Sequence, residues 1–306
     1  MLRKIFTLLM VIGTAKLAVA QTPKVSSGTI QHIQDFPSKF VPARNVDIWL
    51  PDGYDARKKY AVLYMHDGMA LFDAAIMWNK QEWGVDETMD KLLAQNKIKD
   101  CIVVGIWNGN ANRHREYLPQ KPFESLPPQK QDSIYKIKAG DTKLFSGSIQ
   151  SDNYLQFLVK ELKPYIDSHY TTLSDQPNTF IAGSSMGGLI SLYAICQYPK
   201  VFGGAACLST HWTGTFTVDN NPIPAAVMAY LAKHLPSPRK HKIYFDHGDQ
   251  TLDALYAPYQ QQADALMKTK GYTAQNWQSR VFPGADHSEN SWAKRLDVPL
   301  LFLLGR

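Results

Sequence analysis

Gly183-Ser-Ser-Met-Gly-Gly188 is the stretch that decides the fold, because it joins a short apolar run, residues 179–182, to a helix-like run, residues 189–198. A strand that turns directly into a helix holds the residue at the turn in a strained backbone conformation. Only small residues fit two positions before and after it. Ser185 has a glycine at both of these positions and Ser184 does not. The pattern therefore predicts that Ser185 stands exposed at a sharp strand–helix turn, as a candidate nucleophile.

A nucleophilic serine at such a turn needs a base and an acid, which follow it along the chain in the order acid, then histidine. His287 is the one histidine after position 253. It lies in a loop-like stretch that follows the strand-like run 277–282. We therefore expect His287 to be the general base, rather than a polar loop residue without a catalytic role.

Two aspartates compete for the role of the acid. Asp249 comes directly after the strand-like run 242–248, and Asp253 lies in the loop before a helical pattern that begins near Pro258. A proline suits the first turn of a helix, which leaves Asp253 outside that helix. We take Asp253 as the acid and keep Asp249 as the alternative; the other reading of either is a charge near a helix N-terminus.

The chemistry explains why these residue types are needed. A serine hydroxyl attacks an acyl carbonyl only if a base accepts its proton, and the aspartate orients the imidazole that does so. The tetrahedral oxyanion then needs preorganised donors. We expect these donors to be the backbone N–H of Met186, directly after the serine, and that of Met69, with Gly68 as the alternative. His66 precedes the serine, so we expect it to shape the turn instead of acting as a base.

The chain resembles the esterase D-like branch of the α/β-hydrolases, which includes feruloyl and acetyl esterases of carbohydrate esterase family one, enterobactin-type siderophore esterases and mycolyltransferases. The matching pieces are VDIWLPDGY (46–54), YMHDG (64–68), LVKELKPYIDSHY (158–170), AGSSMGGL (182–189) and YPKVFG (198–203). The resemblance implies an α/β-hydrolase fold and carboxylic-ester chemistry. In this branch the acid commonly follows a strand-end glycine more closely than Asp253 follows Gly248. The branch also contains both hydrolases and acyl transferases.

The first twenty residues have the pattern of a cleaved export signal. A basic start at Arg3-Lys4 precedes an apolar run, and Ala18-Val-Ala20 offers a small-residue cleavage site before Gln21. The apolar run is too short to span a bilayer. We predict cleavage after Ala20, a periplasmic or secreted protein without a membrane anchor, and one α/β-hydrolase domain over residues 21–306.

Composition limits the partners of the chain. The formal charge is +6, and the first twenty residues hold three basic residues and no acid, so their removal leaves +3. This mild excess favours neither a nucleic acid nor a membrane surface as a partner. No nucleotide-binding glycine motif is present, and the histidines and cysteines lack metal-ligand spacing. We therefore predict no cofactor and no metal. The pattern leaves open whether two of Cys101, Cys196 and Cys207 pair or all three stay free. The oligomeric state is likewise left open.

Strands and helices alternate along the rest of the chain, which predicts a mostly parallel sheet with helices on both faces and an antiparallel N-terminal edge at residues 29–50. The helices are expected at residues 85–95, 153–169, 189–198, 258–270 and 291–304. Residues 108–151 interrupt this alternation with a long, polar, proline-bearing stretch. We expect an insertion on the substrate side there; the alternative is a partly disordered surface loop.

Substrate contacts are expected at the carboxyl ends of the strands. Trp107 and Trp212 follow strand-like runs, and Arg113 begins the insertion. Aromatic side chains at such places can stack on a sugar or a phenolic acyl group. We therefore predict a small-molecule or oligosaccharide ester substrate of feruloyl or acetyl type. The alternatives are a siderophore-lactone esterase, an acyltransferase, or a non-catalytic carbohydrate-binding protein with this fold.

Overall fold

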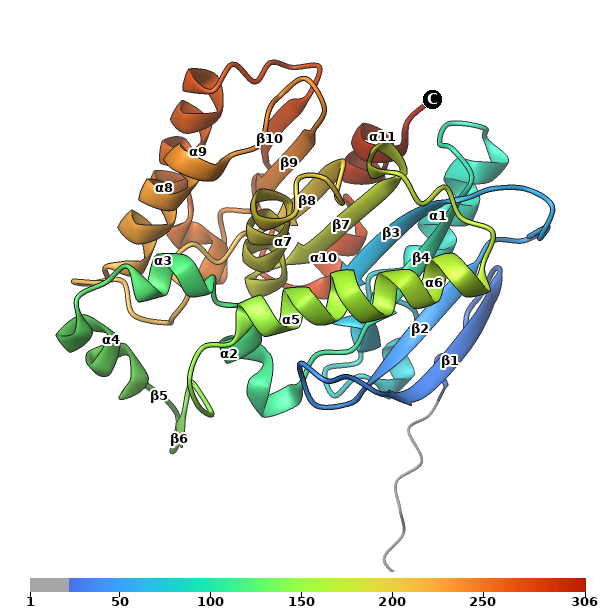
Figure 1. Ribbon diagram of the computed structural model, residues 1–306. Coiled ribbons are helices and arrows are strands. Elements are labelled where there is room, and N and C mark those ends of the chain that lie inside the picture. The colour runs from blue at the N-terminus through green and yellow to red at the C-terminus, as the bar shows by residue number, and fades with distance from the viewer. Residues whose placement is uncertain (1–21) are drawn as a thin grey trace, which may run out of the picture.

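The computed structural model describes residues 22–306 and has an eight-stranded sheet at its centre (Figure 1). The predicted export segment, residues 1–20, lies outside the described residues. In the sheet the strands follow the order β1-β2-β4-β3-β7-β8-β9-β10. Their bounds are β1 Thr29–Phe36, β2 Arg44–Leu50, β3 Ala61–His66, β4 Cys101–Ile106, β7 Thr179–Ser184, β8 Gly204–Leu208, β9 Lys242–His247 and β10 Trp277–Val281.

The predicted fold class is confirmed. Strand β2 pairs antiparallel with both β1 and β4, and every other pair in this sheet is parallel. Strands β3, β4, β7 and β8 consist almost wholly of buried residues, because both of their faces are covered. Since the central strands run parallel, their carboxyl ends meet at one edge of the sheet, where the chain leaves β3, β7, β8 and β9 for the loops of the site.

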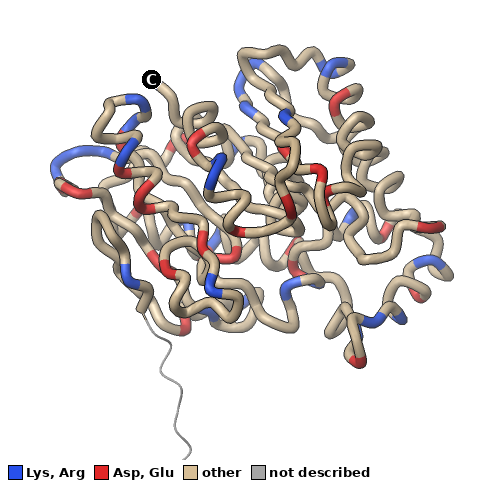
Figure 2. The backbone as a smooth tube through the Cα atoms, turned by 180° about the vertical axis from the view of Figure 1, so that it is seen from behind, with Lys and Arg blue, Asp and Glu red and all other residues tan. Residues whose placement is uncertain are grey.

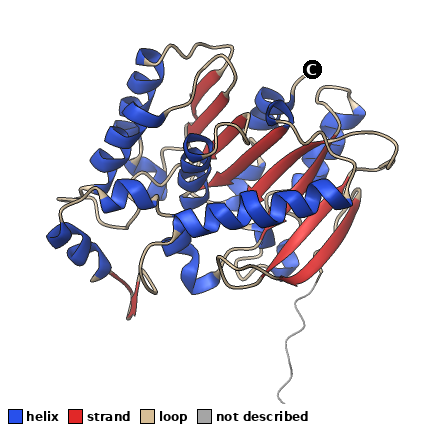
Figure 3. Cartoon of the chain, viewed as in Figure 1, coloured by secondary structure: helices blue, strands red, loops and turns tan. Residues whose placement is uncertain are grey.

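Helices cover both faces of the sheet (Figure 3). One face carries a core that includes Tyr154, Leu189 and Tyr230, and the other face a core that includes Met89, Trp292 and Leu300. The helices are α1 Val85–Ala94, α2 Arg113–Tyr117, α3 Gln120–Glu124, α4 Pro128–Tyr135, α5 Ser151–Phe157, α6 Lys163–His169, α7 Met186–Gln197, α8 Ile223–His234, α9 Ala257–Thr269, α10 Glu289–Ala293 and α11 Asp297–Leu304. None of those in residues 22–306 is long and apolar enough to cross a bilayer.

Two helices differ from expectation. The helix expected at 153–169 begins at Ser151, and a π-helical turn, Leu158–Leu162, joins α5 to α6. The helix expected at 291–304 is two helices, α10 and α11, that meet at a short irregular segment containing Arg295. The side chain of Arg295 is buried and ion-paired, so the break occurs where a charged group has to reach a partner inside the molecule.

The stretch 108–151 contains regular elements and packs on the rest of the protein. It holds α2, α3, α4 and a small hairpin, β5 Lys138–Ala139 with β6 Thr142–Lys143. Phe123 and Phe145 are buried in the core beneath it. Glu116 on α2 forms a buried two-bond ion pair with Arg44 on β2, both N···O distances being 2.9 Å. The insertion is therefore fastened to the antiparallel edge of the sheet.

The described part of the chain carries charges of both signs, and its three cysteines are unpaired. Figure 2 shows acidic and basic residues interspersed along the backbone seen from behind. Cys101, Cys196 and Cys207 are all free and buried, and burial raises the pKa of each thiol. Within residues 22–306, no group of three His, Cys, Asp or Glu side chains is arranged to hold a metal ion.

Candidate active site

Ser185 occupies the turn between β7 and α7 with the strained backbone that its sequence context predicts. Its φ and ψ are 57° and −123°, in a region that side-chain-bearing residues rarely adopt. A Cβ on Gly183 would come within 2.8 Å of the Gly187 backbone, so the residues two before and two after the serine touch each other across the turn. Glycine at Gly183 is thus required by space, and the serine is held at the carboxyl end of the sheet.

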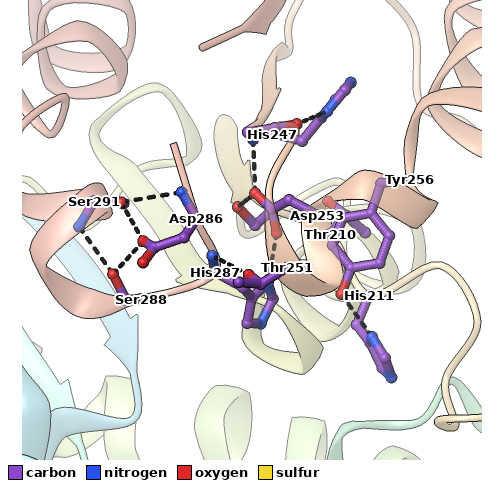
Figure 4. Close-up of polar contacts among 12 residues, drawn as sticks. Thr210, His211, His247, Thr251, Asp253, Tyr256, Asp286, His287, Ser288 and Ser291 are labelled. Atoms are coloured by element: carbon purple, nitrogen blue, oxygen red, sulfur yellow. Dashed lines mark hydrogen bonds and ion pairs between the residues drawn. The ribbon is translucent and has the colours of Figure 1, made fainter. Parts of the chain in front are cut away.

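His287 and Asp253 form a close pair beside this turn. His287 Nδ1 lies 2.5 Å from Asp253 Oδ1 (Figure 4). Asp253 is fully buried and His287 is partly exposed toward a cavity. Of the two aspartates that sequence reasoning left open, Asp253 is the one that contacts the imidazole.

The alternative acid, Asp249, points to solvent and has a different task. Its Oδ1 accepts hydrogen bonds from the N–H of Gly284 (2.7 Å) and from Gln250. The N–H groups of Asp249 and Gln250 in turn donate to Ala285 O, both at 3.1 Å. Asp249 therefore ties the loop that carries His287 to the end of β9.

Asp253 is held by a buried polar network. Its Oδ2 accepts hydrogen bonds of 2.6 Å from the Ser209 hydroxyl and from the Gly248 N–H. Although burial opposes ionisation, the hydrogen bonds from His287, Ser209 and Gly248 lower the pKa of Asp253 below its ordinary value. The carboxylate is therefore charged and fixed, as a group that orients an imidazole must be.

Ser209 connects this carboxylate to residues that sequence reasoning missed. Its hydroxyl accepts hydrogen bonds from Trp292 Nε1 and from an Arg295 guanidinium nitrogen, both at 3.0 Å. Arg295 also pairs with the buried Asp246 on β9, at 3.0 Å. The one available signal was a basic residue within an apolar C-terminal helical pattern, together with an aspartate at the end of an apolar strand.

The imidazole of His287 is fixed on its faces and at its backbone. The Trp292 ring meets it edge-on, with centroids 5.1 Å apart, and the Tyr256 ring does so at 5.8 Å. The His287 N–H donates to the Thr251 hydroxyl at 3.0 Å. The neighbouring Asp286 is occupied by the hydroxyls of Ser288 and Ser291 (Figure 4). The ring therefore has little freedom to turn away from Asp253.

A tyrosine that sequence reasoning did not select lies beside the serine. The Tyr256 hydroxyl is 2.7 Å from His211 Nδ1. Burial raises the pKa of Tyr256 and lowers that of His211 to about 3, so both groups are neutral near pH 7. The backbone N–H of His211 also donates to the backbone carbonyl of Ser185. Tyr256 thus holds the His211 ring, and the His211 backbone holds the turn at Ser185.

The second expected donor loop follows β3. Asp67 has a left-handed backbone (φ 56°, ψ 44°) and starts the 3-10 turn Gly68–Ala70. The first hydrogen bond within this turn is donated by the Ala70 N–H to Asp67 O. The N–H groups of Gly68 and Met69, the two candidate oxyanion donors, come before it and are not used within the turn. A Cβ on Gly68 would lie 2.5 Å from the backbone of β4, which explains the glycine. Met186 is the first residue of α7, where N–H groups have no partner within the helix.

Arg113 holds this loop in place. It forms two hydrogen bonds to the Asp67 carboxylate, of 2.8 and 2.7 Å, and Asn108 adds a third of 2.7 Å. Although burial opposes ionisation, the charge and hydrogen bonds of Arg113 lower the pKa of Asp67. Arg113, which we expected to bind substrate, thus makes its hydrogen bonds to Asp67 of the protein, and it also borders the cavity. His66, as expected, is buried behind the turn, with its Nδ1 2.8 Å from Tyr154 Oη.

The two tryptophans predicted to bind substrate have different surroundings. Trp107 borders the cavity, and its Nε1 donates to Asp47 at 2.5 Å. Trp212 is fully buried, packs on Phe245 and donates to Gln260. The prediction for Trp212 is corrected: the chain turns inward after β8, so this side chain belongs to the core and offers no surface to a ligand.

Ser185 and His287 open into one cavity of about 750 Å³. It lies at the carboxyl ends of the parallel strands, the usual position for a site in such a sheet. Its walls come from the loop after β3, the segment that follows it to α1, the start of the insertion, the turn at Ser185 and the loop and helix after β10. Asn108, Asn110 and Arg113 are the part of residues 108–151 that borders it.

Comparison with known families assigns the chain to a family. The model of the family Esterase, described as "Putative esterase", matches residues 40–303. The chain belongs to the Esterase family. With its fold, this membership makes it a carboxylic-ester hydrolase.

One relative and two solved structures that resemble this esterase have low sequence identity to it. The uncharacterised protein YbbA of Bacillus subtilis is 23% identical over 270 residues, which is 86% of this chain and 93% of YbbA. The ferulic acid esterase AmCE1/Fae1A of Anaeromyces mucronatus has a TM-score of 0.58 at 18% identity, with 92% of this chain and 93% of that chain covered. The enterobactin esterase FES of Shigella flexneri has a TM-score of 0.65 at 17% identity, covering 92% and 60% respectively. These structures share the fold with this esterase.

Proposed function

We propose that this esterase is a serine hydrolase that works through an acyl-enzyme, with Ser185 as nucleophile, His287 as general base and Asp253 as the acid that orients it. The observation that carries the proposal is the 2.5 Å His287–Asp253 pair beside a strained serine that borders the same cavity. Nucleophile, base and orienting group are the three parts that this chemistry requires.

Each step has a residue to perform it. The Ser185 hydroxyl attacks the acyl carbonyl while His287 takes its proton, and the N–H groups of Met186 and Met69 (or Gly68) stabilise the oxyanion. His287 then gives the proton to the departing alcohol. Water, activated by the same imidazole, attacks the acyl-enzyme and releases the carboxylic acid product and free Ser185. Throughout, the Asp253 carboxylate stays ionised and stabilises the imidazolium.

The proposed substrates are carbohydrate-linked or aromatic esters of feruloyl or acetyl type. The support is a wide cavity whose borders include Trp78, Trp107 and several amide side chains, which suits a bulky ligand with polar groups. A solved neighbour is described as a ferulic acid esterase in complex with ferulic acid. Another is an enterobactin esterase, so a siderophore lactone is the competing substrate that the experiment has to separate.

The test combines labelling with turnover. A fluorophosphonate probe should label Ser185, as located by mass spectrometry, and p-nitrophenyl acetate should be hydrolysed. No labelling and no turnover would refute the serine mechanism and leave a non-catalytic carbohydrate-binding role. A panel of methyl ferulate, acetylated xylan and an enterobactin-type trilactone then ranks the substrate classes, and an added alcohol acceptor that outcompetes water would indicate acyl transfer instead of hydrolysis.

We also propose that the protein is exported after cleavage behind Ala20, on the residue pattern at its N-terminus. N-terminal sequencing of the protein recovered from a periplasmic extract or the medium should begin at Gln21. Recovery of the uncleaved chain from the cytoplasm alone would contradict this.

A further inference from the structure

The most exposed large apolar side chain among the described residues is Trp78, at 89% of its full accessible surface. It lies in the segment between the 3-10 turn Ala74–Ile76 and α1, and it borders the catalytic cavity. The other large apolar side chains exposed in residues 22–306 do not border that cavity: Phe216, Val218, Leu255 and Val281. An indole left in water at the mouth of an active site leaves apolar surface available to a ligand.

The segment that carries Trp78 is fastened in place although its indole is free. Asn79 Nδ2 donates to Glu289 Oε2 at 2.9 Å, and the Asn290 N–H donates to Gln81 Oε1 at 3.3 Å. On the other side, Asp73 caps the preceding turn by accepting from the Ala75 N–H at 2.8 Å. The indole therefore projects from an anchored backbone.

The anchoring also says on which side of the scissile bond the indole lies. Glu289 and Asn290 begin α10, two and three residues after His287. In the proposed mechanism His287 gives its proton to the departing alcohol, so that alcohol lies on the His287 side of the serine. The donor Met69 lies at the start of the same segment between β3 and α1, the donor Met186 begins α7, and Trp107 follows β4. The part of the segment around Trp78 is the part that contacts α10, through the side chains of Asn79 and Gln81. Trp78 is thus tied to the part of the site that faces the leaving group.

We propose that Trp78 is the stacking surface of a subsite for a sugar ring in the alcohol part of the ester, with Asn79 and Glu289 beside it. The inference rests on the proposed function, since it uses the role of His287. A sugar ring presents C–H groups on its faces and hydroxyls around its edge. An indole face beside an amide and a carboxylate matches both parts of that chemistry.

The test keeps the acyl group constant and changes only the alcohol. The pairs are methyl ferulate with feruloylated arabinose, and methyl acetate with acetylated xylobiose; the quantity is the ratio of kcat/KM for the sugar ester to that for the methyl ester. Trp78→Ala should lower this ratio between about threefold and tenfold, the size expected for one stacking contact. Trp78→Phe should keep most of the ratio. Val281→Ala, an exposed apolar residue away from the cavity, is the control and should change nothing.

The outcomes separate the two proposals. If Trp78→Ala leaves the ratio unchanged, or lowers turnover of both esters equally, the subsite is refuted while the serine mechanism stands. If Trp78→Ala weakens hydrolysis of a catechol trilactone and not of the sugar esters, the ligand is wrong. If no ester is hydrolysed and Ser185 is not labelled, the proposed function itself fails.

Discussion

The two sides of the cavity are built in opposite ways. On the Asp253 side, the carboxylate accepts hydrogen bonds from His287, Ser209 and Gly248, and the pair is backed by the buried Arg295. On the Trp78 side, the backbone is fastened but the side chain is left in water. The contrast indicates that the two sides have different roles. The groups that transfer protons are held by several hydrogen bonds, whereas the group that contacts the ligand has an anchored backbone and a solvent-exposed side chain. Substitutions on the first side should change the rate for every ester, and those on the second should change the choice among esters.

The largest expected effect is at the serine that both sides share. Ser185→Ala should lower kcat for p-nitrophenyl acetate by about 10⁵-fold or more, because the nucleophile is lost. Ser184→Ala, a neighbour in β7 that keeps the turn intact, is the matched control and should retain turnover within a few fold. A result in which Ser184 is the essential residue would move the nucleophile by one position.

The next effect tests the acid. Asp253→Asn should lower kcat by about 10⁴-fold, because an amide cannot hold the imidazole in the required tautomer. Asp249→Asn keeps an oxygen that can accept from the Gly284 N–H and should lose less than about tenfold. Measured kcat values in the reverse order would assign the acid to Asp249.

Buried histidines on either flank make stability depend on pH. Burial lowers the pKa of both His66 and His211 to about 3, whereas an unfolded histidine titrates near 6.5. Between these values the unfolded chain binds protons that the native state does not, so stability is fully present above about pH 6.5 and falls as the pH decreases. The slope is about 1.4 kcal/mol per pH unit for each group.

Urea unfolding at pH 7, 6 and 5 measures this slope. His211→Gln should make the dependence shallower. An unchanged slope in the His211 variant would mean that this imidazole titrates in the native state as it does in the unfolded chain.

A smaller effect is expected where Asp253 meets its support. Ser209→Ala removes one of the hydrogen bonds to the carboxylate and leaves Trp292 and Arg295 without their shared acceptor. We expect kcat to fall by about tenfold for all esters alike, in line with one lost charge-assisted hydrogen bond. A change in the ratio between sugar and methyl esters would show that this network also reaches the ligand side.

The smallest effect separates the two predicted tryptophans. Trp107→Phe should change relative kcat/KM among methyl ferulate, p-nitrophenyl acetate and acetylated xylan by about twofold to threefold, since the ring borders the cavity. Trp212→Phe should lower the free energy of unfolding and leave these ratios alone, since the side chain is buried. Selectivity that follows Trp212 would contradict its place in the core.

The contrast also explains what could be predicted from sequence. Ser185 and His287 followed from local spacing at the turn and from their order along the chain. The preference for Asp253 over Asp249 rested only on the helix start expected near Pro258, because both aspartates lie in one loop and the path of that loop decides which carboxylate faces the imidazole. Ser209 and Arg295 come from segments 86 residues apart, and no periodic pattern pairs them.

The errors have a similar origin. Trp212 and Trp107 both follow strands, and nothing local says that one side chain turns into the core while the other borders the cavity. Likewise, the helical pattern of the C-terminal residues is interrupted around Arg295, whose side chain is ion-paired with the buried Asp246. Strand ends locate a site, but the tertiary path of each loop decides which side chains enter it.

The three buried thiols can be used to follow the unfolding of this protein by chemical labelling. Cys101 lies in β4, Cys196 in α7 and Cys207 in β8, so they sample the middle of the sheet and the helix behind the serine. A thiol reagent can reach them only when these elements separate, and their raised pKa values keep them protonated until then. The rate of labelling at each position would time, without any engineered probe, which layer of the fold comes apart first. Because these cysteines form no disulfide, their thiols are available to the reagent without prior reduction.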